Sequence, residues 1–267
     1  MKNRKNGARS AVRKAIVHLQ MIERSNTAVL GGDELGARIR RYVAAHEAPS
    51  DDRAAFAKLC HVIFAQGLGF DVVEKHRDAL DDAFCRFAPE AVARIDEARV
   101  GKLLHEPIIR NRAKIEACIQ NARNWQALVT TGNSYLGRIA NTGAQDDAST
   151  GWPKLVALLQ EDFCRLGEPT ARLLLKRWGF FTAVAHAGVQ RTVTRLGLVD
   201  AEIDGPGLQR FVGTLAEATS NDPYAIEAAI AIFAGVGPCR PEPHCSECML
   251  NEDCPTAKLH VATGPEH

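Results

Sequence analysis

Apolar residues recur along most of this chain at the three- and four-residue spacing of an amphipathic α-helix. In residues 11–22 the apolar stripe consists of Val12, Ala15, Ile16, Leu19 and Ile22. In residues 56–64 it consists of Phe56, Leu59, Cys60, Ile63 and Phe64. A third stripe covers residues 108–122, and no run of alternating β-branched residues lies between hairpin turns. The pattern predicts an all-α protein.

Glycine, proline and acidic residues mark the ends of the predicted helices. The run Gly67-Leu68-Gly69 should end the helix of residues 56–64. Asp71 and Glu74 follow with the spacing of a capping box, which predicts a helix from there toward residue 84. Pro89 predicts a helix through residue 95, and a further helix should start at residues 222–223 and run to about residue 234.

Two segments interrupt the helical pattern. Residues 141–151 (NTGAQDDASTG) are small and polar, which predicts a loop before a helix at 152–163. Residues 204–207 (DGPG) form a second break, which would separate a cationic helical region from the C-terminal quarter. No internal repeat or low-complexity tract is present in the sequence.

The 267 residues are 46% hydrophobic and 24% charged, which excludes a disordered or fibrous chain. The net charge is +1, so a polyanion would have to bind local basic patches. Residues 1–14 include six lysines and arginines and no acidic residue. Residues 165–195 include six lysines and arginines and a single acidic residue, Glu168. With no uninterrupted apolar run of about 18 residues and no secretory signal, we expect a cytoplasmic protein without a membrane segment.

Four of the eight cysteines lie in one C-x5-C-x2-C-x5-C pattern: Cys239, Cys245, Cys248 and Cys254. Structural zinc sites usually take their ligands from two short cysteine pairs that are a dozen or more residues apart. Here, all four sulfurs come from one short loop and would have to surround the bound metal group. A [4Fe-4S] cluster suits that geometry better, and zinc is the alternative. His244 fits a loop residue better than a ligand. The scattered Cys60, Cys85, Cys118 and Cys164 are expected to be small core hydrophobes.

The order of these features resembles the endonuclease III and MutY group of helix-hairpin-helix DNA glycosylases. LCHVIFAQGLGFDVV (59–73) is similar to the family's first barrel helix, and residues 165–199 resemble its hairpin, second helix and catalytic segment. EPIIRNRAKIEACIQNAR (106–123) also resembles 3-methyladenine DNA glycosylase I, which has a similar I-I-R-x-R-x-K-I run. The cysteine loop is one residue shorter than is typical of the group, and only Leu166 and Gly167 remain of the hairpin's L-x-G-x-G.

The resemblance implies two helical domains: a six-helix barrel with a degenerate hairpin at 57–186, and a helical cluster domain at 187–267 that packs with an N-terminal arm at 1–56. It places the hairpin at 164–169, with Thr170 opening the next helix. Backbone N–H groups around Gly167 and Thr170 would bind a DNA phosphate, helped by Arg172 and Lys176. Gln66 stands where relatives insert a side chain into the gap left by a flipped base.

The positions that carry the family's chemistry differ in this chain. Pro169 replaces the lysine that forms a Schiff base in bifunctional members, so no AP-lyase activity is expected. His186 replaces the catalytic aspartate, and His61 replaces the MutY-type glutamate. An imidazole with its ordinary pKa of about 6.5 transfers protons near neutral pH, but does not stabilise a cation-like sugar as a carboxylate does. Either the base is a good leaving group, or Asp71 or Glu74 enters the pocket.

The leading hypothesis is a monofunctional DNA glycosylase of base excision repair that holds a [4Fe-4S] cluster. It would act as a monomer, associated with the nucleoid of a bacterium, on double-stranded DNA with a modified base. The substrate would be an alkylated or electron-poor base. One alternative is a non-catalytic protein that binds damaged or structured DNA on the same fold. Another is a zinc-stabilised helical interaction module.

Overall fold

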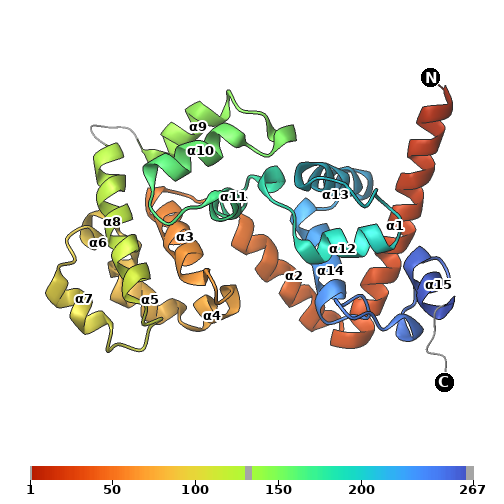
Figure 1. Ribbon diagram of the computed structural model, residues 1–267, viewed down its shortest axis with the longest axis horizontal. Helices are drawn as coiled ribbons and strands as arrows, with labels where there is room; N and C mark the ends of the chain where they lie inside the picture. The colour runs from red at the N-terminus through yellow and green to blue at the C-terminus, as the bar shows by residue number, and fades with distance from the viewer. Residues whose placement is uncertain (1, 130–133, 263–267) are drawn as a thin grey trace. The chain divides into compact units, whose positions relative to one another are not determined.

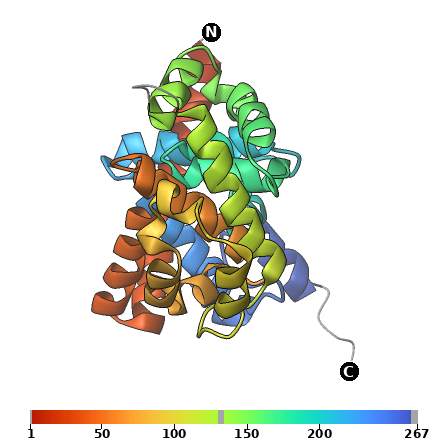
Figure 2. The same ribbon diagram turned by 90° about the vertical axis from the view of Figure 1, so that its left-hand side faces the viewer.

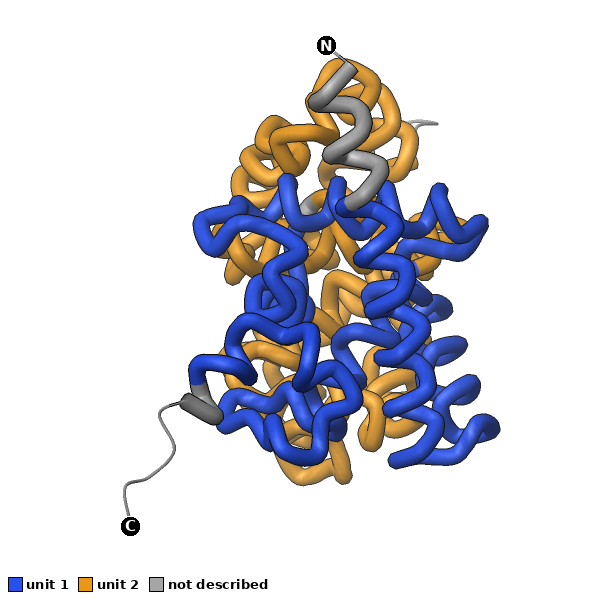
Figure 3. The backbone as a smooth tube through the Cα atoms, turned by 90° about the vertical axis from the view of Figure 1, so that its right-hand side faces the viewer, with its two compact units in different colours: residues 1–46, 184–267 blue, residues 47–183 orange. Residues whose placement is uncertain are grey.

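Helices and short turns build the whole described structure, a computed structural model that covers residues 2–129 and 134–262 (Figure 1). No strand occurs within these ranges, which confirms the all-α prediction. The chain forms two compact units, coloured separately in Figure 3. Unit 1 comprises residues 1–46 and 184–267, and unit 2 comprises residues 47–183. The six-helix barrel and the boundaries at residues 56 and 186 stay predictions.

Unit 1 is built around its most apolar helix. Its helices are α1 (Lys2–Leu30), α2 (Gly32–His46), α12 (Ala187–Arg195), α13 (Gly205–Thr219), α14 (Pro223–Gly235) and α15 (Pro255–Ala262). Helix α14 packs against α1, α2, α12 and α13, because its sequence PYAIEAAIAIFAG is apolar on nearly every side. Asp222 caps this helix by accepting from the backbone N–H of Tyr224 at 2.7 Å, as the Asp-Pro start predicts.

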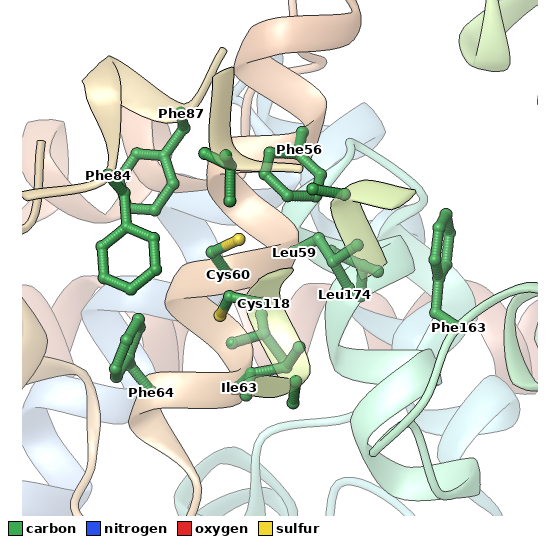
Figure 4. Packing of buried hydrophobic residues seen from close by; sticks show 14 of the residues in the cluster. Phe56, Leu59, Cys60, Ile63, Phe64, Phe84, Phe87, Cys118, Phe163 and Leu174 are labelled. Carbon is green, nitrogen blue, oxygen red and sulfur yellow. The ribbon is translucent and has the colours of Figure 1, made fainter. Parts of the chain in front are cut away.

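Unit 2 surrounds a core made by α3, α8 and α11. Its helices are α3 (Asp52–Ala65), α4 (Phe70–Lys75), α5 (Arg77–Ala83), α6 (Pro89–Val92), α7 (Glu97–Leu103), α8 (Arg112–Leu128), α9 (Tyr135–Gly143), α10 (Pro153–Asp162) and α11 (Glu168–Arg177). The long helix α8 runs diagonally across unit 2 in Figure 2. Figure 4 shows Phe56, Leu59 and Ile63 of α3 gathered with Cys118 of α8 and Leu174 of α11. The apolar stripe of residues 56–64 therefore faces the core, as its spacing predicts.

The predicted capping box at Asp71 and Glu74 is wrong. Helix α4 begins one residue before Asp71, its N-cap is Gly69, and no side chain caps it. Glu74 instead forms an ion pair with Arg77 at 2.5 Å, one turn further along. The helix ends at Lys75, and α5 follows as a separate helix, so the single helix expected toward residue 84 is two.

Other boundaries also differ from the prediction for local reasons. The DGPG run starts a helix, because Asp204 accepts from the N–H of Gly207 at 2.7 Å and so caps α13. Helix α8 begins after its N-cap Asn111 rather than at residue 108. Helix α6 ends at Val92, and α9 extends into the loop predicted for 141–151. Cys85 is exposed, unlike the buried Cys60 and Cys118, so it is not a core residue.

No helix among the described residues has the combined length and hydrophobicity that crossing a bilayer requires.

Candidate functional site

The hairpin between α10 and α11 is held by a buried asparagine of α8. The Oδ1 atom of Asn121 accepts from the backbone N–H of Cys164 at 2.8 Å, and its Nδ2 donates to the Cys164 carbonyl at 3.1 Å. Asn121 is completely buried, so this amide replaces the solvent that the hairpin backbone loses. Arg165 lies next to it, exposed and in the left-handed region with φ +58°.

Gly167 is the N-cap of α11, so this helix begins at Glu168, two residues before the expected start at Thr170. Gly167 and Glu168 are exposed, and Thr170 is half-buried. The start of α11 therefore faces solvent, which suits an anion site, although the carboxylate of Glu168 would oppose a phosphate there.

A tight turn after α3 adjoins this hairpin. The side-chain amide of Gln66 donates to the Arg165 carbonyl at 2.8 Å and to the Thr170 hydroxyl at 3.3 Å. Gly67 and Gly69 have φ of +73° and +84°, backbone angles that favour glycine. Leu68 stands between them with 48% of its surface exposed. The structure thus brings the predicted residues Gln66 and Thr170 together and leaves an apolar side chain at the tip of the turn.

Two other predicted phosphate contacts lie further along α11. Arg172 forms an ion pair with Glu168 at 3.0 Å and also donates to the Gly151 carbonyl at 2.7 Å. Lys176 is 2% exposed, and its ammonium lies 6.0 Å from the centre of the Phe181 ring. Phosphate contacts by Arg172 and Lys176 stay predictions.

Sequence reasoning missed Lys114 and Asn121, both buried on α8. A signal for them exists, since both fall at core positions of the stripe that includes Ile115 and Cys118. A polar residue on an apolar helix face is buried at a cost unless it has partners, so each such residue indicates a specific contact. The partners of Lys114 are described below.

His61 lies on α3 against the ring of Phe87, in an edge-on arrangement with centroids 5.0 Å apart. Its Nε2 atom is buried and has no hydrogen-bond partner. Burial, helped by the charges of Arg77 and Arg177, lowers the pKa of His61 to about 4. The imidazole is therefore neutral at pH 7, whereas a histidine with the ordinary pKa of about 6.5 would be about one quarter protonated at that pH.

The carboxylate whose charge acts on His61 is that of Glu74, on α4. A hydrogen bond from Arg77 lowers the pKa of Glu74, which keeps this carboxylate ionised. Asp71 is exposed in the first turn of the same helix.

His186 belongs to unit 1, where it caps α12. Its Nδ1 accepts from the backbone N–H of Gly188 at 3.1 Å, which assigns the proton of a neutral ring to Nε2. The predicted meeting of His61 and His186 in one pocket stays a prediction, because the two residues belong to different units.

The buried neutral state of His61 predicts a pH-dependent stability. Because the folded pKa of about 4 lies below the unfolded value of about 6.5, the unfolded chain binds the proton more readily. His61 should therefore cost up to about 3 kcal/mol of unfolding free energy as the pH falls from about 6.5 to about 4. Urea unfolding of His61→Leu should show a smaller loss over this window. The exposed His105→Leu serves as control, and equal pH slopes in all three proteins would contradict the prediction.

The four clustered cysteines of unit 1 line a single pocket. It lies between α14, the end of α12 and the start of α15, with Phe233, Leu196 and Pro238 among its apolar lining. None of the four cysteines forms a disulfide, and His244 is not part of the lining. Gly237 permits the chain to leave α14 tightly, since a Cβ there would lie 2.6 Å from the Phe233 carbonyl oxygen.

Arg195, at the end of α12, contacts both ends of this loop. Its guanidinium donates to the Arg240 and Pro241 carbonyls at 2.6 and 2.8 Å and lies 3.9 Å from the Cys239 sulfur. The Arg195 carbonyl accepts from the Cys254 thiol at 3.3 Å. One residue thus links the first and last cysteines of the loop.

The described residues contain no group of three or more His, Cys, Asp or Glu side chains placed closely enough to hold a single metal ion. The convergence of four thiols on one pocket is nevertheless the donor set that an iron-sulfur cluster uses. Burial raises the pKa of the Cys245 thiol, and its neighbours Cys254 and Cys239 raise it further.

Comparison with known proteins gives a partial match. Residues 45–158 match the methyladenine glycosylase family. This matched segment is less than half of the chain, and it ends before the hairpin and the cysteine loop. It supports the resemblance of residues 106–123 to 3-methyladenine DNA glycosylase I, while the likeness to endonuclease III and MutY stays a prediction.

Individual proteins similar to this chain are 3-methyladenine DNA glycosylases. A DNA-3-methyladenine glycosylase of Haemophilus influenzae is 29% identical over 86 residues, which are 32% of this chain and 46% of that protein. A crystal structure of 3-methyladenine DNA glycosylase I is 27% identical over 51% of this chain and 82% of that chain, with a TM-score of 0.45. The enzyme from Staphylococcus aureus is 23% identical over 51% of this chain and 80% of its own, with a TM-score of 0.44. The chain therefore spans about half the length of the first of these relatives.

Proposed function

We propose that this protein is a monofunctional DNA glycosylase that removes an alkylated base from double-stranded DNA by hydrolysis of the N-glycosidic bond. The observation that carries the proposal is the methyladenine glycosylase match, which spans α3 to the middle of α10. Alkylation at a ring nitrogen gives the base a positive charge, so the base departs without needing a strong general acid. A site with histidines in place of two carboxylates suits such a substrate.

The hairpin and the neighbouring turn supply the proposed DNA contacts. Backbone N–H groups at the start of α11, with the exposed Arg165, would bind a phosphate beside the damaged base. Leu68 is the better candidate to enter the duplex, because the amide of Gln66 is already bound to the hairpin. An apolar wedge would fill the space that the flipped base leaves.

The proposed catalytic residues are His61, Asp71 and His186. With its low pKa, His61 is neutral at pH 7 and suits orientation of the attacking water better than protonation of the base. Asp71 and the ionised Glu74 both lie on α4 and are the carboxyl groups that we propose stabilise the cation-like sugar. In this assignment, the carboxylates that stabilise the sugar come from α4 and not from the positions that the endonuclease III and MutY group uses.

We further propose that Cys239, Cys245, Cys248 and Cys254 bind a [4Fe-4S] cluster, with zinc as the alternative. Their convergence on one pocket supports this proposal, and thiolates are the ligands that iron-sulfur clusters use. When bound, such a cluster supplies a structural crosslink rather than chemistry on the base. Arg195 would orient Cys239 and carry positive charge toward the anionic thiolates.

The direct test is base release. Duplexes with 3-methyladenine and other modified bases should lose the base when incubated with the purified protein as a monomer, as followed by mass spectrometry. Strand breaks should appear only after alkali, and borohydride should trap no covalent adduct, because Pro169 stands in the lysine position.

Each outcome separates two functions. Tight binding to damaged duplexes without release of any base would favour the non-catalytic DNA-damage binding protein. A trapped adduct would show that another lysine forms a Schiff base. Freshly purified protein without absorbance near 400 nm and with bound zinc would replace the cluster by the zinc site.

A further inference from the structure

A buried lysine of α8 holds the end of α3. The ammonium of Lys114 donates to the Phe64 carbonyl at 2.9 Å and to the Gln66 carbonyl at 2.5 Å. Lys114 is 6% exposed, and burial together with the charge of Arg165 lowers its pKa. A buried ammonium is costly unless its donors are bound, so these two contacts determine where it lies.

The two carbonyls lie at the C-terminal end of α3, the negative end of the helix dipole. At this point the chain leaves the helix and enters the turn that bears Leu68. By binding Phe64 and Gln66 together, Lys114 fixes both the last turn of α3 and the direction in which the next residues leave it.

The same segment is tied to the hairpin. The backbone of Gln66 binds Lys114, while its side chain binds the Arg165 carbonyl and the Thr170 hydroxyl. Two turns further along α8, Asn121 holds the hairpin at Cys164. Helix α8 is therefore a common support for the turn and for the hairpin, with Gln66 as the bridge between them.

We propose that Lys114 is a positioning residue that, through Gln66, holds the Leu68 turn at a fixed place beside the hairpin. The turn would then enter the duplex where the hairpin binds phosphate. This inference rests on the proposed glycosylase function. Lys114 does not contact the reacting atoms in this scheme. Its effect is to hold the Leu68 turn in a fixed position relative to the hairpin that would bind phosphate.

The test replaces Lys114 by methionine, which has similar length but no charge and no donor. A duplex with 2-aminopurine beside the damaged base reports unstacking through its fluorescence, and single-turnover base release reports the reaction. We expect Lys114→Met to lower the single-turnover rate by about 10²-fold, the usual effect of a misplacement near 1 Å, and to weaken the fluorescence change. Affinity for an undamaged duplex should change less than about threefold, because Asn121 still holds the hairpin.

Two further variants keep the test decisive. Gln66→Leu removes the bridge from a half-buried side chain, so it should reproduce the fluorescence defect even if Lys114→Met folds poorly. Lys102→Met removes an exposed lysine from α7 and should behave as wild type. Normal fluorescence and rates in well-folded Lys114→Met and Gln66→Leu would overturn the inference.

Failure of the glycosylase function looks different. If the wild-type protein released no base but still unstacked 2-aminopurine, the glycosylase would be wrong, and the fluorescence of the two variants would still decide the role of Lys114. A wild-type protein that neither released the base nor changed the fluorescence would overturn both proposals.

Discussion

Cys248→Ala is expected to give colourless protein that is poorly soluble and does not bind DNA. The reason is that the proposed cluster would lose one of its four thiolates, and the free energy of its binding would then no longer stabilise unit 1. The loop is sixteen residues long, and Arg191 and Arg195 bind its backbone at Cys239 and Arg240; without the fourth thiolate we expect the remainder to lose its conformation. Absorbance near 400 nm, iron content and duplex affinity measure the effect.

Cys85→Ala is the matched control, because this thiol is exposed and lies in the other unit. It should retain colour, iron and affinity. A Cys248→Ala variant with wild-type solubility and DNA affinity would show that the loop needs no cluster. If Cys248→Ala lost zinc rather than iron, the bound metal would be zinc, and the structural role of the cysteine loop would still hold.

Asn121→Leu is expected to lower the free energy of unfolding by about 2 to 4 kcal/mol, since it leaves a backbone N–H and a carbonyl of Cys164 without their partner. The melting temperature should fall by roughly 5 to 15 °C. Because the hairpin would lose its support on α8, duplex affinity should fall by at least about tenfold. Thermal unfolding and duplex titration at one fixed salt concentration measure both effects.

Asn124→Ala provides the comparison on the same helix. From a half-buried position, its Nδ2 donates to the Asp162 carbonyl at 3.0 Å and its Oδ1 accepts from the side chain of Gln120, on the surface of the same helix, at 2.9 Å. Loss of these contacts should cost about 1 kcal/mol with little change in affinity. If Asn121→Leu melted and bound DNA like Asn124→Ala, the hairpin would not depend on the buried amide.

The spacing of apolar residues correctly predicted much of the secondary structure. The stripe from Phe56 to Phe64 faces the core of unit 2, and the Asp222-Pro223 start opens the central helix of unit 1. These predictions succeeded because burial of one helix face and capping by an aspartate are local properties of neighbouring residues. The cysteine spacing likewise predicts a shared site, and the structure places all four thiols in one pocket.

Several helix boundaries depended on which of two local arrangements the same residues adopt, and the sequence alone does not decide between them. Asp71 and Glu74 have capping-box spacing, yet Glu74 binds Arg77 and Gly69 begins the helix. The DGPG run has the composition of a loop, but Asp204 makes it a helix start. In each case two local arrangements satisfy the same residues, and packing of the rest of the unit selects one.

By itself, the sequence determined the all-α class, the helical core faces and the grouping of the four cysteines, since each follows from spacing along the chain. Tertiary structure decided which polar residues matter to the proposed site. Lys114 reaches Phe64 and Gln66, and Gln66 reaches Arg165, across separations of 48 to 99 residues. The low pKa of His61 has the same origin, because burial by residues distant in sequence removes the solvent that would stabilise its charge.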